Sequence, residues 1–152
     1  MTAPITSKSG LPDFDLTRFL PYRLAVAAEK LSEGLARRYR TEFGISVPEW
    51  RVLVHLAHSG NVSVRDIEAR VAMEKSKVSR AASRLEAAGY IAKEINESDR
   101  RLLQLSLTQK GRALMARLLP IAIAYQAEVA ARLAETLQGF EAGLDRITGD
   151  KV

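Results

Sequence analysis

The stretch of sequence that decides the fold covers residues 63–112 and reads SVRDIEARVAMEKSKVSRAASRLEAAGYIAKEINESDRRLLQLSLTQKGR. Its beginning predicts a short helix, because Ser63 and Asp66 have the spacing of a capping box in which Asp replaces Glu. Val62 and Ile67 fall at the two positions of a hydrophobic staple, which fixes how the chain enters that helix. We expect the helix to end near residues 71–72.

A second helix and a hairpin follow in the same stretch. Residues 74–88 form the helix, which Gly89 closes. Residues 90–95 and 102–107 are strand-like, and in the latter the leucines alternate with polar residues at a period of two. The turn between the strands, residues 96–101, reads NESDRR. A helix pair followed by a hairpin with a cationic tip is the layout of a winged helix.

Two helices are predicted upstream of this stretch. Residues 14–42 carry apolar side chains at steps of three, four and seven, which indicates one long helix. Pro21 would cost about 3 kcal/mol inside a helix, so the helix either starts near Pro21 or kinks there. Ser46 caps the next helix, which stops at residues 59–61.

Two more helices are predicted downstream. Thr108 caps a long helix that runs to about Leu137, with Pro120 as the expected position of a kink. Residues 140–147 form a final helix. The sequence therefore predicts a mainly α fold with a small β-hairpin, which is a winged helix-turn-helix with helices on either side.

The totals bound the class of protein. The chain has 152 residues, of which 47% are hydrophobic, so it is about one domain long and can bury a core. Its formal net charge is +5, and 11 basic against 7 acidic side chains lie within residues 62–112. The absence of cysteine fits a reducing cytoplasm and excludes disulfides and thiol chemistry. We expect no signal segment, and no uninterrupted apolar run approaches the roughly 18 residues of a membrane span.

The helix over residues 74–88 has two contrasting faces. Placed at about 100° per residue, its apolar residues share one face that must pack on the preceding helices. Between Lys75 and Leu85 there are four cations and no acid. The opposite face suits a DNA groove, because Lys and Arg neutralise phosphates, Arg pairs with guanine and Ser allows close approach. Its members are Ser76, Lys77, Arg80, Ser83 and Arg84. The alternative is an ordinary solvated helix face, and only the neighbouring capped helix and hairpin favour DNA.

The turn of the hairpin carries Asp99, Arg100 and Arg101. A cationic tip of this kind suits the minor groove, where the electrostatic potential is most negative. Asp99 could hold one guanidinium by a bidentate pair. The alternative is a solvent-exposed polar turn.

At this point the sequence resembles a known family, the MarR family of bacterial transcriptional regulators. The resemblance is carried by VRDI, KSKVSR, RLEAAGYI, SDRR and LSLTQKG, which are residues 64–67, 75–80, 84–91, 98–101 and 105–111. It implies that the recognition helix offers Ser76, Lys77, Ser79, Arg80, Ser83 and Arg84 to DNA, and that the wing tip offers Asp99, Arg100 and Arg101.

The resemblance also implies a homodimer that binds a pseudo-palindromic operator in double-stranded DNA. In the family the terminal helices of two subunits interlock. The sequence independently favours a partner chain, because residues 113–137 are apolar nearly all round and one small subunit would struggle to cover them. The expected organisation is an arm and dimerisation helix over residues 1–45, a DNA-binding lobe over 46–112, and C-terminal dimerisation helices over 113–152.

Many members of the family lose DNA affinity when a small aromatic carboxylate or phenol binds, so a repressor released by such an effector is the expected function. The residues expected to line the effector site are Tyr22, Arg23, Trp50, Arg51 and His55. Arg would take a carboxylate and the aromatic rings would stack. The alternative is that Trp50 anchors the core and His55 is satisfied or solvated. A branch that senses peroxide is excluded, because it needs cysteine. No metal and no cofactor are expected, since His55 and His58 lack further ligands nearby.

An enzyme and a protein-interaction module are the two alternatives to a DNA-binding regulator. No catalytic constellation is visible, because the chain lacks Cys, has two His and has no Gly-rich phosphate loop. A winged helix used only as a protein-interaction module is the other alternative. Such a module has no need of a cationic recognition face, so this face favours the DNA-binding regulator.

Overall fold

The computed structural model describes residues 10–71, 73–95, 97–99 and 103–149. The chain divides into two compact units, Met1–Gly34 and Leu35–Val152. We describe each unit by itself. The expected wing-tip residues Arg100 and Arg101 lie outside the described residues.

The first unit contains a short 3-10 helix, η1 (Leu16–Arg18), and the start of α1 (Leu20–Phe43). Asp15 caps η1 by accepting a hydrogen bond from the backbone N–H of Thr17 at 3.0 Å. Because α1 begins at Leu20, Pro21 lies in its first turn, where a missing N–H costs nothing. The sequence prediction that the helix starts near Pro21 is confirmed. The extension of that helix back to residue 14 was wrong.

The helix α2 (Val47–Ser59) follows the end of α1 in the second unit. Ser46 accepts a hydrogen bond from the backbone N–H of Glu49 at 3.3 Å, and its hydroxyl donates to the Glu49 carboxylate at 2.7 Å. The helix ends at Gly60, whose φ of 73° is a backbone conformation that favours glycine. The start and end predicted for this helix are therefore confirmed.

The helix pair that follows is α3 (Val64–Arg70) and α4 (Lys75–Ala87). Ser63 caps α3 as predicted, accepting a hydrogen bond from the backbone N–H of Asp66 at 3.0 Å. Val62 and Ile67, the two staple positions, are both buried in the core.

The sheet has three strands, where the sequence predicted a two-stranded hairpin. The strands β2 (Ile91–Ile95) and β3 (Leu103–Leu107) pair antiparallel, and β1 (Val62–Ser63) pairs with the other side of β3. The order across the sheet is β1-β3-β2. A strand of two residues is too short to show alternation. Its extended backbone is instead the approach to the N-cap of α3.

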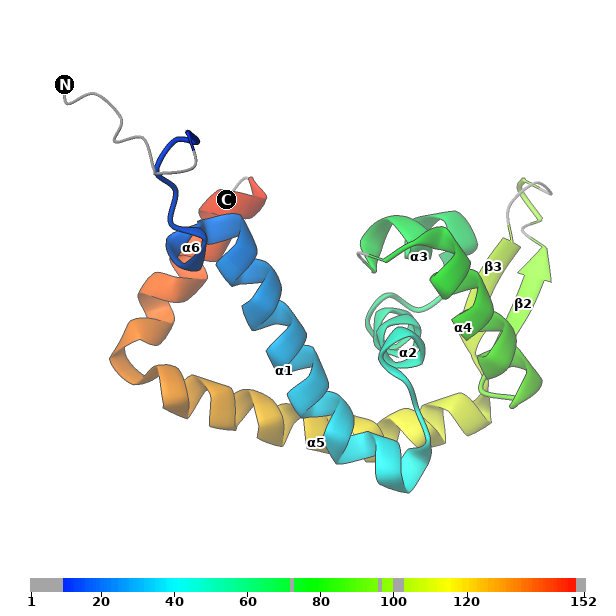
Figure 1. Cartoon of the computed structure of the whole chain (residues 1–152). Coiled ribbons are helices and arrows are strands. Elements are labelled where there is room, and N and C mark those ends of the chain that lie inside the picture. The colour runs from blue at the N-terminus through cyan, green and yellow to red at the C-terminus, as the bar shows by residue number, and fades with distance from the viewer. Residues whose placement is uncertain (1–9, 72, 96, 100–102, 150–152) are drawn as a thin grey trace. The chain divides into compact units, whose positions relative to one another are not determined.

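The core of the second unit lies where α2, α3, α4, α5 and the sheet meet (Figure 1). The inner face of α4 supplies four buried side chains, as the helical wheel predicted: Val78, Ala81, Ala82 and Leu85. Leu53 and Leu56 of α2 and Leu105 of β3 are buried in the same cluster. This packing fixes which face of α4 remains outside.

The end of α1 that belongs to the second unit is held against α5 (Gln109–Leu133). Arg38 forms a bidentate ion pair with Glu128, and its guanidinium lies 5.2 Å from the centre of the Tyr125 ring. The bond to Glu128 raises the pKa of Arg38. Arg117 donates to the Glu42 carboxylate at 3.0 Å. The two ion pairs join this end of α1 to α5 at two points.

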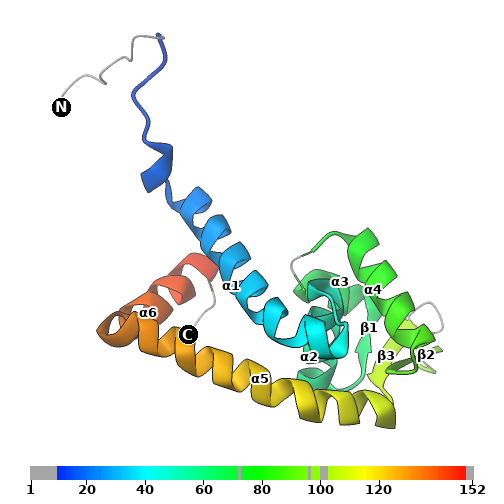
Figure 2. The same cartoon turned by 60° about the horizontal axis from the view of Figure 1, so that its bottom comes forward.

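The C-terminal helices differ in detail from the prediction. The helix α5 continues through Pro120 and ends at Leu133, where η2 (Ala134–Thr136) leads into α6 (Leu137–Thr148) (Figure 2). The expected single helix to about Leu137 is broken earlier because Ala134 has a positive φ of 50°. The final helix begins three residues before the predicted residue 140.

These helices expose much apolar surface. The run from α5 to α6 is long and apolar enough to cross a membrane by length and composition, a test that helices of soluble proteins also pass. Ile123 is 68% exposed and Ile147 is 62% exposed, and no residue of α6 is buried. An exposed apolar surface of this size is typical of a site that another molecule or chain covers.

The junction between α4 and α5 is closely packed. Thr108 caps α5 by accepting a hydrogen bond from the backbone N–H of Gly111 at 3.0 Å, and its own backbone N–H donates to the carbonyl of Tyr90 at 3.0 Å. A Cβ at Gly111 would lie 2.0 Å from that same carbonyl oxygen. Only glycine therefore lets the start of α5 approach the start of β2 this closely.

We expect Gly111→Ala to lower the free energy of unfolding by about 1–3 kcal/mol, because the backbone of Tyr90 cannot move without disturbing the sheet. Helix propensity alone predicts the opposite sign, a gain of about 1 kcal/mol. Ala113→Gly, at an exposed position of the same turn, measures the propensity contribution separately. Chemical denaturation of the three proteins decides the matter, and a stabilised Gly111→Ala would show that the junction is loose.

The half-buried His55 lies on α2 where this helix meets α3. Burial lowers the pKa of His55, and the positive charges of Arg70 and His58 lower it further. The native state therefore favours the neutral imidazole. As the pH falls below the ordinary value of 6.5, the unfolded chain takes up a proton that the folded chain resists, and stability is lost.

We expect the unfolding free energy of the wild-type protein to fall between pH 7.5 and 5.5 by more than that of His55→Gln, which has no proton to gain at this position. Urea titrations at a series of pH values measure both slopes. Equal slopes would show that His55 titrates alike in the folded and unfolded states.

Candidate nucleic-acid interface

The outer face of α4 is polar and cationic along its whole length. All six residues that the resemblance assigned to this face are exposed: Ser76, Lys77, Ser79, Arg80, Ser83 and Arg84. Lys75, which the predicted site omitted, is exposed in the first turn of the same helix. No acidic residue lies between Lys75 and Leu85, so only Glu74 and Glu86, at the two ends of the helix, offset the positive charge of this face.

The N-terminal end of α4 is suited to an anion. Glu74, the N-cap, makes no side-chain capping bond, whereas Ser46, Ser63 and Thr108 cap their helices. The positive end of the helix dipole therefore adds to the charges of Lys75 and Lys77 in the same turn. Cations at this end of a helix are unfavourable until an anion arrives, and phosphate groups are suitable partners.

The arginines of this face have different surroundings. The Nε of Arg80 donates a hydrogen bond to the carbonyl of Ser76 at 3.3 Å, which holds the side chain along its own helix. Arg84 lies one turn further on and is exposed. The serines between them are short, so the backbone of α4 can come close to a flat or grooved surface.

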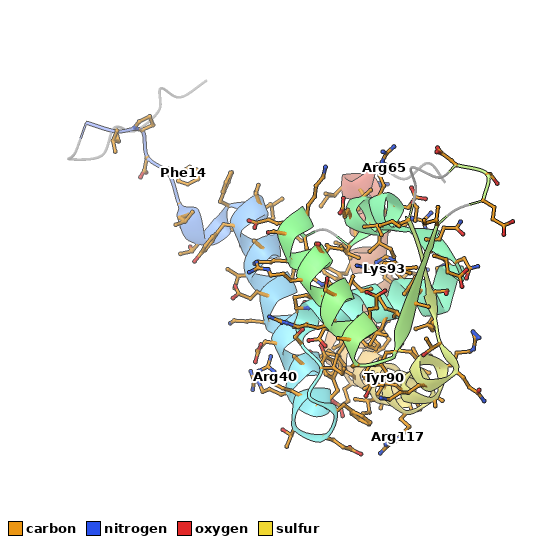
Figure 3. The ribbon with its side chains drawn as sticks, turned by 90° about the vertical axis from the view of Figure 1, so that its right-hand side faces the viewer. Phe14, Arg40, Arg65, Tyr90, Lys93 and Arg117 are labelled. Atoms are coloured by element: carbon orange, nitrogen blue, oxygen red, sulfur yellow. The ribbon has the colours of Figure 1, made fainter. Side chains whose placement is uncertain are left out.

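The helix before α4 also carries exposed cations, one of them in its first turn. Arg65 lies in the first turn of α3 and points outward (Figure 3). The predicted site did not include Arg65, because its residues were taken only from α4 and the wing tip. Its position in the first turn after the Ser63 cap was visible in the sequence.

The wing is tied to α4 at its base. Lys93 of β2 lies 3.8 Å from the carboxylate of Glu86 of α4, which offsets the only acid near the C-terminal end of that helix within residues 75–87. Asp99, near the tip, is half-buried. The predicted pair of Asp99 with a neighbouring arginine involves Arg100 or Arg101, which lie outside the described residues.

The predicted effector residues have separate environments. Tyr22 and Arg23 are exposed and belong to the first unit. Trp50 stacks on Tyr39 with ring centres 5.7 Å apart. Arg51, on the same helix, donates to the carbonyl of Val71 at 3.5 Å.

Within the second unit, Trp50 thus packs against the core, while Arg51 reaches α3. Two cavities of about 360 and 380 Å³ in this unit are lined by other residues. The larger cavity lies between the end of α2 and the start of α5. Its lining side chains are mostly apolar, and Arg112 is a charged residue of the lining. Within the described ranges, no group of three or more His, Cys, Asp or Glu residues could hold a metal ion.

Comparison with known proteins places these features in a family. Residues 43–102 match the MarR family. The HTH-type transcriptional repressor Rv2887 of Mycobacterium tuberculosis is 29% identical over 143 residues, which are 93% of this chain and 99% of that repressor. The HTH-type transcriptional regulator TtmR of Methylorubrum extorquens is 26% identical over 75% of this chain, which spans 58% of that protein's length.

Solved structures share the fold over nearly the whole chain. A MarR family transcriptional regulator from Silicibacter pomeroyi matches with a TM-score of 0.76 and 27% identity, covering 97% of this chain and 96% of that one. BpsR of Bordetella bronchiseptica, whose DNA binding is regulated by 6-hydroxynicotinic acid, matches with a TM-score of 0.77 and 21% identity. It covers 92% of this chain and 99% of its own, and shows the fold alone. In its winged helix, its three-stranded sheet and the match over residues 43–102, the chain is similar to the MarR family of helix-turn-helix transcriptional regulators.

Proposed function

We propose that this regulator binds a pseudo-palindromic site in double-stranded DNA as a homodimer and acts as a cytoplasmic repressor. The observation that carries the proposal is the division of α4 into a buried apolar face and an exposed cationic face that has no acid between Lys75 and Leu85. A helix so anchored presents its outer face as a rigid unit, as a recognition helix in the major groove must.

The proposed contacts divide by chemistry. Lys77 and the serines Ser76, Ser79 and Ser83 bind phosphates, while Arg80 and Arg84 reach base edges or phosphates. The wing tip, with Asp99, Arg100 and Arg101, enters the minor groove, where Arg101 makes the main contact.

The homodimer is supported by the apolar surface of α5 and α6. These helices leave large hydrophobic side chains exposed, among them Ile123, Phe140 and Ile147. A second copy of the chain would cover this surface and place two recognition helices on one side of the DNA, about one helical turn apart.

Arg80→Ala and Arg84→Ala are each expected to weaken binding to the cognate site by roughly 1–3 kcal/mol if these arginines read bases. The site is first selected by the wild-type protein from random-sequence duplex DNA, and affinities are measured by fluorescence anisotropy over a range of salt concentrations. Binding should weaken steeply with salt, as for any interface with many phosphate contacts.

Arg37→Ala is the matched control, since Arg37 is an exposed arginine on α1 and not on α4. Its affinity should equal that of the wild type. If both α4 variants bind as tightly as Arg37→Ala, the recognition helix does not lie in the interface. If the wild-type protein selects no site, the interaction-module alternative is favoured instead.

The repressor is further proposed to release DNA when a small aromatic or phenolic acid binds. Support comes from BpsR, whose DNA binding is regulated by 6-hydroxynicotinic acid. The proposed site residues of the second unit are Trp50, Arg51 and His55, with the Arg51 guanidinium for the carboxylate. Such a ligand acts by preferring a conformer whose recognition helices are wrongly spaced for the operator.

A thermal-shift screen of hydroxylated aromatic acids, 6-hydroxynicotinic acid among them, is expected to find a compound that raises the melting temperature and weakens operator binding. Arg51→Ala should weaken the response to that compound while leaving DNA affinity without it unchanged. A compound that stabilises the protein equally in the variant would place the effector away from Arg51.

A further inference from the structure

The C-terminal end of α4 is held by side chains from the start of α5. The last carbonyl groups of a helix have no partner within it, and they carry the negative end of the helix dipole. The ammonium of Lys110 donates to the carbonyl of Ala88 at 2.7 Å. The hydroxyl of Thr108 donates to the carbonyl of Gly89 at 2.6 Å. Both acceptors immediately follow α4, and both donors lie at the beginning of α5.

Lys110 makes more than one contact at this junction. Its ammonium lies 4.8 Å from the centre of the Tyr90 ring, within the range of a cation–π interaction. A Cβ built at Gly89 would lie 3.7 Å from Cδ of Lys110, so the lysine stem lies over the turn that leaves α4. The side chain thus combines a hydrogen bond, a favourable charge at the helix end and a ring contact. Tyr90 lies at the end of α4 where the chain passes beside α5 (Figure 3).

Two other contacts at this junction join the start of α5 to the start of β2, and not to α4. The backbone N–H of Thr108 bonds to Tyr90, and Gly111 packs against the same carbonyl. Lys110 is the side chain that reaches past them to Ala88, the C-cap residue of α4 itself. It therefore connects the recognition helix to the helix that leads away to the dimerisation region.

We infer that Lys110 is a positioning residue for DNA recognition: it sets the direction of α4 relative to α5 without contacting DNA. The inference rests on the proposed function of α4. In a dimer joined through α5 and α6, the spacing of the two recognition helices depends on this direction in both subunits. A change in the direction of α4 occurs in both subunits, so the spacing between the two recognition helices changes by both contributions.

The test compares Lys110→Met, Lys110→Arg and Arg84→Ala with the full-length wild type on the duplex that the wild type selects from random-sequence DNA. Lys110→Met keeps the length of the stem and removes the charge and the donors. We expect it to weaken operator binding by about five- to thirtyfold, as for the loss of about 1–2 kcal/mol of positioning interactions. Lys110→Arg should recover most of that loss.

Two readouts separate positioning from phosphate contact or simple destabilisation. The slope of log affinity against log salt should be unchanged in Lys110→Met, whereas a lost phosphate contact lowers it by about one. On duplexes with one base pair added or removed between the half-sites, the wild type should lose affinity sharply. Lys110→Met should lose less, because its recognition helices no longer hold one spacing.

Two results for Lys110→Met would contradict a positioning role. A lowered salt slope would make Lys110 a phosphate contact, and unchanged operator affinity would leave it without a positioning role. If Lys110→Met does not fold, Lys110→Gln, which keeps a neutral donor, takes its place with the same expectations. A wild-type protein that selects no DNA site at all would remove the proposed function itself, which is a different result from a failure of the variant.

Discussion

The packing of one face of α4 into the core is the constraint on which the rest of the structure depends. Val78, Ala81, Ala82 and Leu85 are all buried, and two of the four are alanines. Their small side chains bring the helix axis close to α2, so α4 has little freedom to roll. A roll would expose leucine and bury arginine at once. The cationic face therefore takes its direction from apolar contacts on the opposite side of the helix.

The same division explains how much of the fold could be predicted from the sequence. Hydroxyl caps at Ser46, Ser63 and Thr108 are local in sequence, so their helix starts were predicted to within a residue or two. The inner face of α4 follows from helical periodicity and was also predicted. By contrast, β1 exists only because β3 lies beside it, and a two-residue strand has no pattern of its own. The break at Ala134 was missed for a related reason, since alanine is the best helix former and gives no local signal of a positive φ.

The residue types of the candidate site could be predicted from the sequence, but the contacts that hold the site in place could not. The exposed residues of α4 follow from composition and spacing, but Lys110 was seen only as part of a motif at a helix start. Its partner, the carbonyl of Ala88, lies 22 residues away in the sequence. Backbone acceptors have no sequence identity, so no residue pattern could have shown this contact. Trp50 is a similar case: the sequence left its ring between a ligand site and a core anchor, and its contact with Tyr39 on α1 joins two helices, which no local pattern shows.

The backbone break at Ala134 has a consequence for how this architecture can diversify. The change of direction between α5 and α6 is concentrated in one residue, whose φ of 50° is unusual for any side chain larger than that of glycine. A change in that single dihedral angle re-aims α6 while α5 and the winged helix stay in place. In the proposed dimer, the geometry of subunit pairing can thus change independently of the surface proposed to bind DNA. The spacing between the two proposed recognition helices would then change while each helix keeps its own residues.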